Sequence, residues 1–230
     1  SELPPFRLSK DFEYSVVTYL EDGTLAYLRH YGPRGYQVFA LRPGGRVWEL
    51  ALEERTPPDE TAFPAYGYWN WPTVFTYGSE WRVLHAAGGR VRVVPVPRGA
   101  LVAITGDGLL LHREDALWLR RWDAPADERL RDFPYDVGEG FSDGVRVFLM
   151  ARKPGRTDAE SRLRLFLMDT PTGVPRQIAV PLERSYSGSI LDSHGPFGLI
   201  DCWAERASWI GLVDLRKGTL RKVGDRFEWN

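Results

Sequence analysis

Apolar and polar residues alternate along most of the chain in short runs, which are separated by glycine, proline and aspartate. A period of two places successive side chains on opposite faces of a β-strand, and Gly, Pro and Asp favour the turns between strands. No stretch shows the 3.6-residue period of a long amphipathic helix. The pattern therefore predicts an all-β chain.

Five segments share one pattern, in which an alternating apolar run leads into a turn and a second alternating run leads out of it. Matched turn positions fall at Gly45, Gly89, Glu128, Gly173 and Gly218. Successive turns are thus 39–45 residues apart, close to the roughly 40–50-residue period of four-stranded propeller blades. The spacing indicates a structural repeat.

A second hairpin precedes most of these segments. Its turn is Asp22-Gly23, Asp107-Gly108 or Asp143-Gly144 in three repeats, and residues 195–198 (Gly-Pro-Phe-Gly) stand at the matching place in the last one. Asp-Gly between two apolar runs is a strong hairpin signal, because glycine adopts a positive φ at little cost. Each repeat is therefore predicted to form four antiparallel strands, which is one propeller blade.

Together these patterns predict a single domain over residues 1–230, a five-bladed β-propeller of four-stranded antiparallel blades. The blades are expected at about 12–54, 60–98, 99–134, 137–183 and 186–224. The second blade is irregular, because an aromatic segment replaces its first hairpin. A four-bladed propeller and a β-sandwich or β-solenoid are the alternatives.

In its repeat pattern the chain resembles the WD40-like and other propeller-repeat proteins over nearly its whole length. The Gly-His dipeptide of WD40 repeats is absent, and Trp-Asp occurs only at Trp122-Asp123 instead of once in each repeat. The resemblance therefore implies the fold and carries no family function.

Composition excludes several classes of protein. The chain has 30 basic and 31 acidic residues and a formal charge of −1, which argues against nucleic acid or an anionic membrane as partner. No apolar run approaches the roughly 20 residues that span a bilayer. Cys202 is the only cysteine, so it forms no intramolecular disulfide, and we expect it in the core. The chain fits a cytoplasmic protein, or an extracytoplasmic one if Ser1 follows a removed signal peptide.

The most distinctive stretch is Phe63–Phe75, which holds six aromatic residues in thirteen positions. Exposed tyrosine and tryptophan supply large, stiff contact area and dominate binding hot spots. A binding patch would use the four central rings, Tyr66, Tyr68, Trp69 and Trp71. The alternative is structural, with these rings filling the space between the first two blades.

In a propeller, the loops that join the fourth strand to the next first strand, and the second to the third, share one face. We expect Tyr135, Glu139 and Tyr186 on this loop face and include them in the candidate binding site. Glu139 begins a predicted inner strand and is the best-placed carboxylate for a glycosidase-like site, which uses two such groups. The other candidate carboxylates are Glu13, Asp136 and Asp192.

The sequence offers no motif for covalent catalysis or phosphate binding, because neither Gly-x-Ser-x-Gly nor a phosphate-binding glycine loop occurs. His30 and His112 occupy matching places but are too few for a metal site. We therefore expect no catalytic residue, no metal ligand and no cofactor. The leading hypothesis is a non-enzymatic binding or scaffold propeller that docks a protein or peptide on its loop face. The alternative is a carbohydrate-binding or glycoside-hydrolase-like propeller.

Overall fold

A computed structural model of the chain describes residues 15–19, 25–30, 36–41, 47–50, 74–77, 80–87, 90–97, 99–124, 126–153, 162–179, 187–204 and 207–225. The regular elements in these residues are nineteen β-strands in five antiparallel sheets. The chain folds as two compact units, residues 1–98 and 99–230. Among the described residues no helix is long and apolar enough to cross a membrane.

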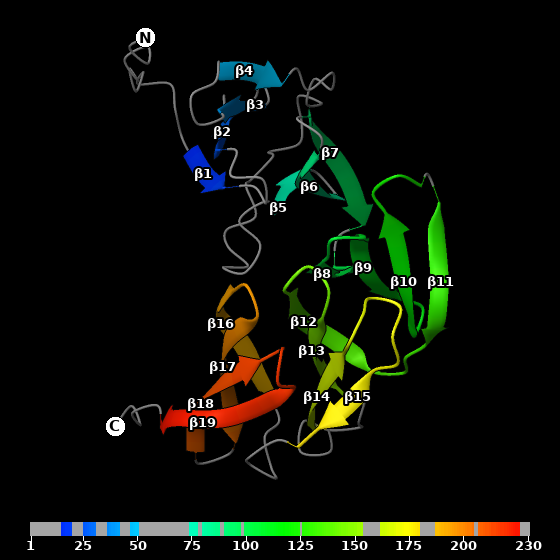
Figure 1. Ribbon diagram of the computed structural model, residues 1–230, viewed down its shortest axis with the longest axis vertical. Coiled ribbons are helices and arrows are strands. Elements are labelled where there is room, and N and C mark those ends of the chain that lie inside the picture. The colour runs from blue at the N-terminus through cyan, green and yellow to red at the C-terminus, as the bar shows by residue number, and fades with distance from the viewer. Residues whose placement is uncertain are drawn as a thin grey trace. The chain divides into compact units, whose positions relative to one another are not determined.

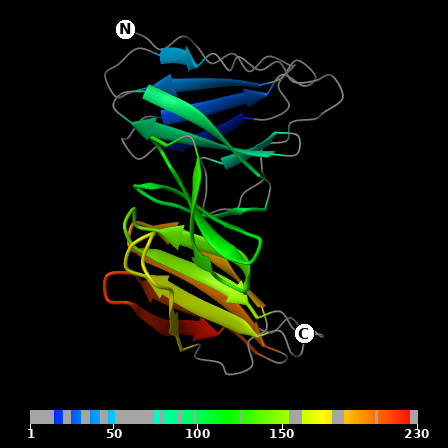
Figure 2. The same ribbon diagram turned by 90° about the vertical axis from the view of Figure 1, so that its right-hand side faces the viewer.

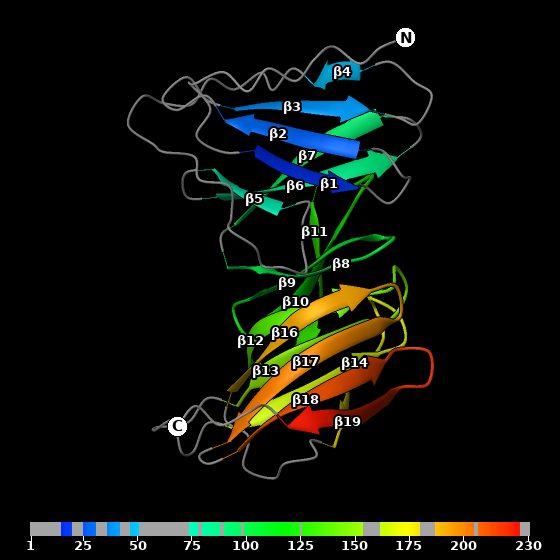
Figure 3. The same ribbon diagram turned by 90° about the vertical axis from the view of Figure 1, so that its left-hand side faces the viewer.

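The first unit contains two sheets, in which each strand pairs with the next along the chain (Figure 3). The first sheet consists of β1 (Ser15–Tyr19), β2 (Leu25–His30), β3 (Tyr36–Leu41) and β4 (Val47–Leu50). The second sheet has three strands, β5 (Val74–Tyr77), β6 (Glu80–Ala87) and β7 (Arg90–Pro97). On β6 the side chains of Trp81, Val83 and His85 are buried, as a period of two on one sheet face requires.

The second unit contains three four-stranded sheets (Figure 1). The third sheet consists of β8 (Leu101–Ile104), β9 (Gly108–Arg113), β10 (Ala116–Arg121) and β11 (Asp127–Asp132). The fourth consists of β12 (Asp136–Ser142), β13 (Val147–Arg152), β14 (Leu163–Met168) and β15 (Arg176–Ile178). The fifth consists of β16 (Ser187–His194), β17 (Phe197–Ala204), β18 (Ala207–Asp214) and β19 (Thr219–Asp225). Along the chain these sheets follow one another from green to red (Figure 2).

The Asp143-Gly144 turn shows why the sequence reverses where it does. The Oδ1 atom of Asp143 accepts the backbone N–H groups of Val145 at 3.0 Å and of Arg146 at 2.7 Å. Gly144 has a φ of 95°, which residues with a side chain rarely adopt. Burial alone would raise the pKa of Asp143, but the hydrogen bonds from Arg146 and Val145 outweigh it and leave this pKa below its usual value. The carboxylate is therefore a fixed part of the turn.

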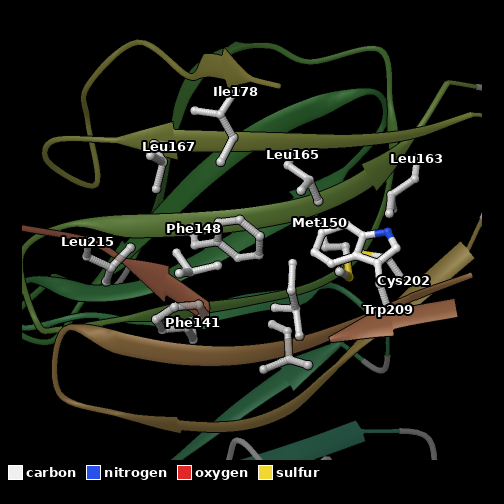
Figure 4. Close-up of a cluster of buried hydrophobic side chains, with 13 residues drawn as sticks. Phe141, Phe148, Met150, Leu163, Leu165, Leu167, Ile178, Cys202, Trp209 and Leu215 are labelled. Atoms are coloured by element: carbon white, nitrogen blue, oxygen red, sulfur yellow. The ribbon is translucent and has the colours of Figure 1, made fainter. Parts of the chain in front are cut away.

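The three sheets of the second unit pack through their first strands, because β12 lies against β8 on one side and β16 on the other. Two apolar clusters fill the spaces between the sheets. One joins the third and fourth sheets and contains Leu110, Leu117, Phe133, Leu149 and Phe166. The other joins the fourth and fifth sheets and contains Phe141, Phe148, Met150, Cys202 and Trp209 (Figure 4). This arrangement is typical of neighbouring propeller blades.

Glycines let the sheets approach closely at both of these contacts. A Cβ on Gly140 of β12 would lie 2.7 Å from the carbonyl oxygen of Val102 on β8. A Cβ on Gly198 of β17 would lie 2.3 Å from two ring atoms of Phe141 on β12. Both distances are well below van der Waals contact, so neither position has room for a side chain.

The structure confirms the coarse part of the sequence prediction. The described residues are all-β, and four of the five sheets have four antiparallel strands in chain order. The Asp-Gly turns at 107–108 and 143–144 join β8 to β9 and β12 to β13.

We predict that Gly198→Ala lowers the free energy of unfolding by about 1–3 kcal/mol, the usual cost of overpacking a core. Phe141 is 2% exposed, and its ring occupies the place that the added Cβ would take. Gly224→Ala is the matched control, because a Cβ there meets nothing within 4 Å. It should change stability by less than about 0.5 kcal/mol. Urea denaturation measures both variants, and equal losses would contradict the assigned contact between the fourth and fifth sheets.

Candidate functional site

The candidate site is one end of the second unit, which we call the loop end. Here β12 and β16 begin, β13 ends and β14 begins. Among the described residues at these strand ends are Tyr135, Asp136, Arg152, Lys153, Arg162 and Ser187. The opposite end, formed by the β12–β13, β14–β15 and β16–β17 turns, is called the turn end.

Tyr135 lies immediately before β12 and is half-buried. Its ring centroid is 4.9 Å from that of Phe133 and 4.9 Å from that of Phe166, and both phenylalanines are buried. The Tyr135 backbone N–H also donates to the carbonyl of Phe133 at 2.8 Å. The sequence therefore places at this end an aromatic side chain that is held on two sides and partly open to solvent.

Glu139 lies on β12, and its side chain points toward the fifth sheet. Its Oε2 atom accepts the backbone N–H of Ile190 on β16 at 2.6 Å. Each strand has a β-bulge at this point, between Val137 and Glu139 on β12 and between Ile190 and Asp192 on β16. A bulge bends a strand and re-aims a side chain. Glu139 thus links β12 to β16, which are the first strands of two different sheets and do not pair with each other.

Burial raises the pKa of Glu139, and the hydrogen bond from Ile190 offsets only part of that effect. The carboxylate is half-buried. Ionised Glu139 therefore costs some stability at neutral pH, while its neutral form fits the site better.

A second contact joins the fourth and fifth sheets at the loop end. The Nη2 atom of Arg152, the last residue of β13, donates to Oγ of Ser187 at 2.6 Å. Arg152 is exposed, whereas Ser187 is 9% exposed. Beside it, the backbone N–H of Lys153 donates to the carbonyl of Arg162 at 3.3 Å, and both side chains are exposed. Sequence reasoning missed this group because Arg152 and Ser187 are 35 positions apart.

The carboxylates named from the sequence occupy different places. Asp136 lies on the same face of β12 as Glu139, opposite Arg152 in the register. Asp192 pairs with Leu199, on the other face of the fifth sheet from Ile190, and its Oδ1 atom accepts the N–H of Ser193 at 2.8 Å. Asp192 therefore does not face Glu139. Glu13 lies outside the described residues.

Cys202 is fully buried, as the sequence predicted. Burial, together with the charge of Asp201, raises its pKa to about 12. The group is thus a thiol at neutral pH and a poor nucleophile. Asp201 is itself fully buried on β17, which nothing in the apolar run around it signalled.

His112 is held by the fold. Its Nε2 atom lies 3.1 Å from the carbonyl oxygen of Phe133 and therefore carries the proton that it donates there. The described part of the chain contains no group of three or more His, Cys, Asp or Glu side chains that could hold a metal ion.

The remaining candidate residues, Tyr66, Tyr68, Trp69, Trp71 and Tyr186, lie outside the described residues. They stay predictions, as do the binding roles of Tyr135 and Glu139.

The turn end differs from the loop end in character. Three of the large apolar side chains that are most exposed in the described residues lie at this end, Val145 at 55% and Val174 at 75% between strands and Phe197 at 43% at the start of β17. Val145 and Val174 therefore offer aliphatic control positions against which variants of the loop end can be compared.

No protein-family model matches the chain, and no curated protein matches its sequence. Solved structures similar to it include putative TolB from Agrobacterium tumefaciens, at 12% identity and a TM-score of 0.44, with 94% of this chain and 82% of that chain covered. Prolyl oligopeptidase B from Galerina marginata matches at 12% identity and a TM-score of 0.49, over 94% of this chain and 38% of that one. The tricorn protease matches at 11% identity and a TM-score of 0.33, over 90% of this chain and 20% of that one. Likeness at this level assigns neither a family nor an activity.

We predict that Glu139→Gln stabilises the protein at pH 7 by about 1 kcal/mol, the usual scale of a single polar substitution. Glutamine keeps an acceptor for the Ile190 N–H and removes the buried charge. The folded-state pKa of Glu139 is raised above its ordinary value of 4.5. The stability that the neutral side chain contributes is therefore complete below pH 4.5 and is lost as the pH rises through the folded-state pKa. The advantage of the variant should therefore vanish near pH 4.

Thermal unfolding of the wild type and Glu139→Gln between pH 4 and pH 8 measures this difference. Glu139→Ala is the control, because it removes the acceptor and should be less stable than the wild type throughout. A glutamine variant that is less stable at pH 7 would show that the ionised carboxylate stabilises the fold.

Proposed function

We propose that the chain is a five-bladed β-propeller that docks a protein or peptide partner at its loop end. Sheets that are buried on both faces support a ring of blades. Leu109 and Leu111 of β9 point away from the fourth sheet, because Leu110 packs toward it, yet both are fully buried. Asp201 of β17 likewise points away from the fourth sheet and is fully buried. Burial on both faces is what the central position of a sheet in a ring of blades requires.

The observation that carries the docking function is the placement of Tyr135. Its ring rests on two buried aromatic side chains and is partly open to solvent. A stiff aromatic ring that is already ordered loses little entropy when it binds, and such residues commonly anchor protein interfaces. A rigid sheet scaffold that holds short loops at one end suits this use.

The state of the reactive groups in the described residues favours binding over catalysis. The Cys202 thiol is buried and protonated, and His112 is tied to the backbone. Glu139 and Asp192, two of the carboxylates proposed from the sequence, lie on sheet faces that do not oppose each other.

The test is selection from a peptide library displayed on phage against the immobilised chain. Peptides should be selected, and Tyr135→Ala should weaken their binding at least tenfold, about 1.4 kcal/mol. Val174→Ser at the turn end is the control and should change the dissociation constant less than twofold. Thermal unfolding of Tyr135→Ala checks that the chain is folded at the assay temperature.

Two results would contradict the docking proposal. One is a set of peptides whose binding is lost in Val174→Ser and kept in Tyr135→Ala. The other is selection of no peptide at all, while oligosaccharides on a glycan array bind, which would favour the carbohydrate-binding alternative.

A further inference from the structure

The loop end carries a group of basic side chains, Arg152, Lys153 and Arg162, which we call the basic rim. All three are exposed, and the β13–β14 pairing brings their backbones together. Over residues 152–164 the sequence has five basic and two acidic residues, in a chain whose formal charge is −1. The local positive charge therefore does not follow from a generally basic composition.

Five arginines elsewhere in the second unit have carboxylate partners, whereas Arg131, Arg164, Arg176, Arg216 and Arg221 form no ion pair within the described residues. Arg120 contacts Asp127 at 2.6 Å, and Arg113 contacts the same carboxylate at 2.9 Å while stacking on Trp118. Further pairs join Arg121 to Glu128, Arg129 to Asp132 and Arg146 to Asp143. These arginines serve the fold by neutralising charge on its strands and turns.

The basic rim has no such partners within the described part of the chain, where none of its three side chains forms an ion pair. Asp136 stands opposite Arg152 in the strand register, yet the two do not pair. Instead, the Arg152 guanidinium donates one hydrogen bond to Ser187, which orients it and leaves its other N–H groups for a ligand.

We propose that the basic rim binds a carboxylate-rich segment of the docked partner, an extended peptide that carries several Asp or Glu side chains. This inference rests on the proposed docking function and adds the chemistry of the partner. The planar guanidinium matches a carboxylate through two parallel hydrogen bonds, and an arginine that is already oriented by Ser187 loses less freedom on binding. Tyr135, which precedes the same sheet, supplies the apolar contact.

The size of the basic rim favours a peptide over a nucleic acid. A typical nucleic-acid interface neutralises roughly 6–10 phosphates with basic side chains. Three side chains at one strand end fit a few carboxylates of a short segment, and charge complementarity of this kind sets specificity and association rate.

The probe is a fluorescein-labelled peptide with six glutamates separated by glycine and serine, and its binding is followed by fluorescence anisotropy at low salt. Matched peptides carry glutamine or lysine in place of glutamate. The triple variant Arg152→Gln, Lys153→Gln, Arg162→Gln should raise the dissociation constant of the glutamate peptide at least tenfold. Asp136→Asn should lower it, because it removes a negative charge beside Arg152.

The matched control is the triple variant Arg216→Gln, Lys217→Gln, Arg221→Gln. It removes the same charge from exposed positions at the β18–β19 turn and along β19. It should change the dissociation constant less than threefold. Circular dichroism of both triple variants checks that each is folded.

Equal losses in the two triple variants would overturn the inference, since they would show only the effect of net charge. So would equal binding of the glutamine peptide, absence of binding by the glutamate peptide, or tighter binding of a phosphopeptide, a single-stranded RNA or phosphatidylserine vesicles. If the phage selection yields uncharged peptides that depend on Tyr135, the docking function stands and the acidic partner is wrong. If it yields no peptides, the docking function itself fails.

Discussion

The fold depends on burying both faces of each central sheet. On β13 every residue from Val147 to Ala151 is buried, so both faces of the fourth sheet need an apolar cover. A single sheet cannot supply this, and neighbouring sheets must lie against it on each side. The hydrophobic effect therefore selects a repeating stack, in which each blade is stable only next to others. The regular turn spacing in the sequence is the consequence of that requirement.

Contacts between the packed sheets fix the positions of the groups at the loop end. Gly140 lets β12 approach the backbone of β8, and Gly198 makes room for the ring of Phe141. The Glu139–Ile190 and Arg152–Ser187 hydrogen bonds tie the fourth sheet to the fifth. Tyr135 is held by the same packing, since its aromatic neighbours belong to the cluster between the third and fourth sheets. The groups proposed to bind a partner are thus ordered before the partner arrives, and this lowers the entropic cost of binding.

Local signals in the sequence were enough to predict most of the described strands and turns, but the turn expected at Glu128 was wrong, because Glu128 lies on β11. Asp143-Gly144 encodes its own turn, because an Asp side chain accepts backbone N–H groups two and three residues on. The exposure of the basic rim could not be predicted from local signals, and neither could the hydrogen bond between Glu139 and Ile190. That bond spans 51 positions and depends on two bulges that only the folded strands reveal. The buried Asp201 escaped notice for a related reason, since burial of a charge is decided by tertiary neighbours.

Closure of the ring is tested most directly by double electron–electron resonance, which measures the distances between spin labels. Labels on introduced cysteines at Glu49 of β4, Arg129 of β11 and Arg221 of β19 mark the outer strands of the first, third and fifth sheets. Cys202→Ser removes the native thiol. In a closed ring the first and fifth sheets are neighbours, so the 49–221 distance should be shorter than the 49–129 distance. A 49–221 distance longer than the 49–129 distance would show an open stack of sheets and contradict the propeller.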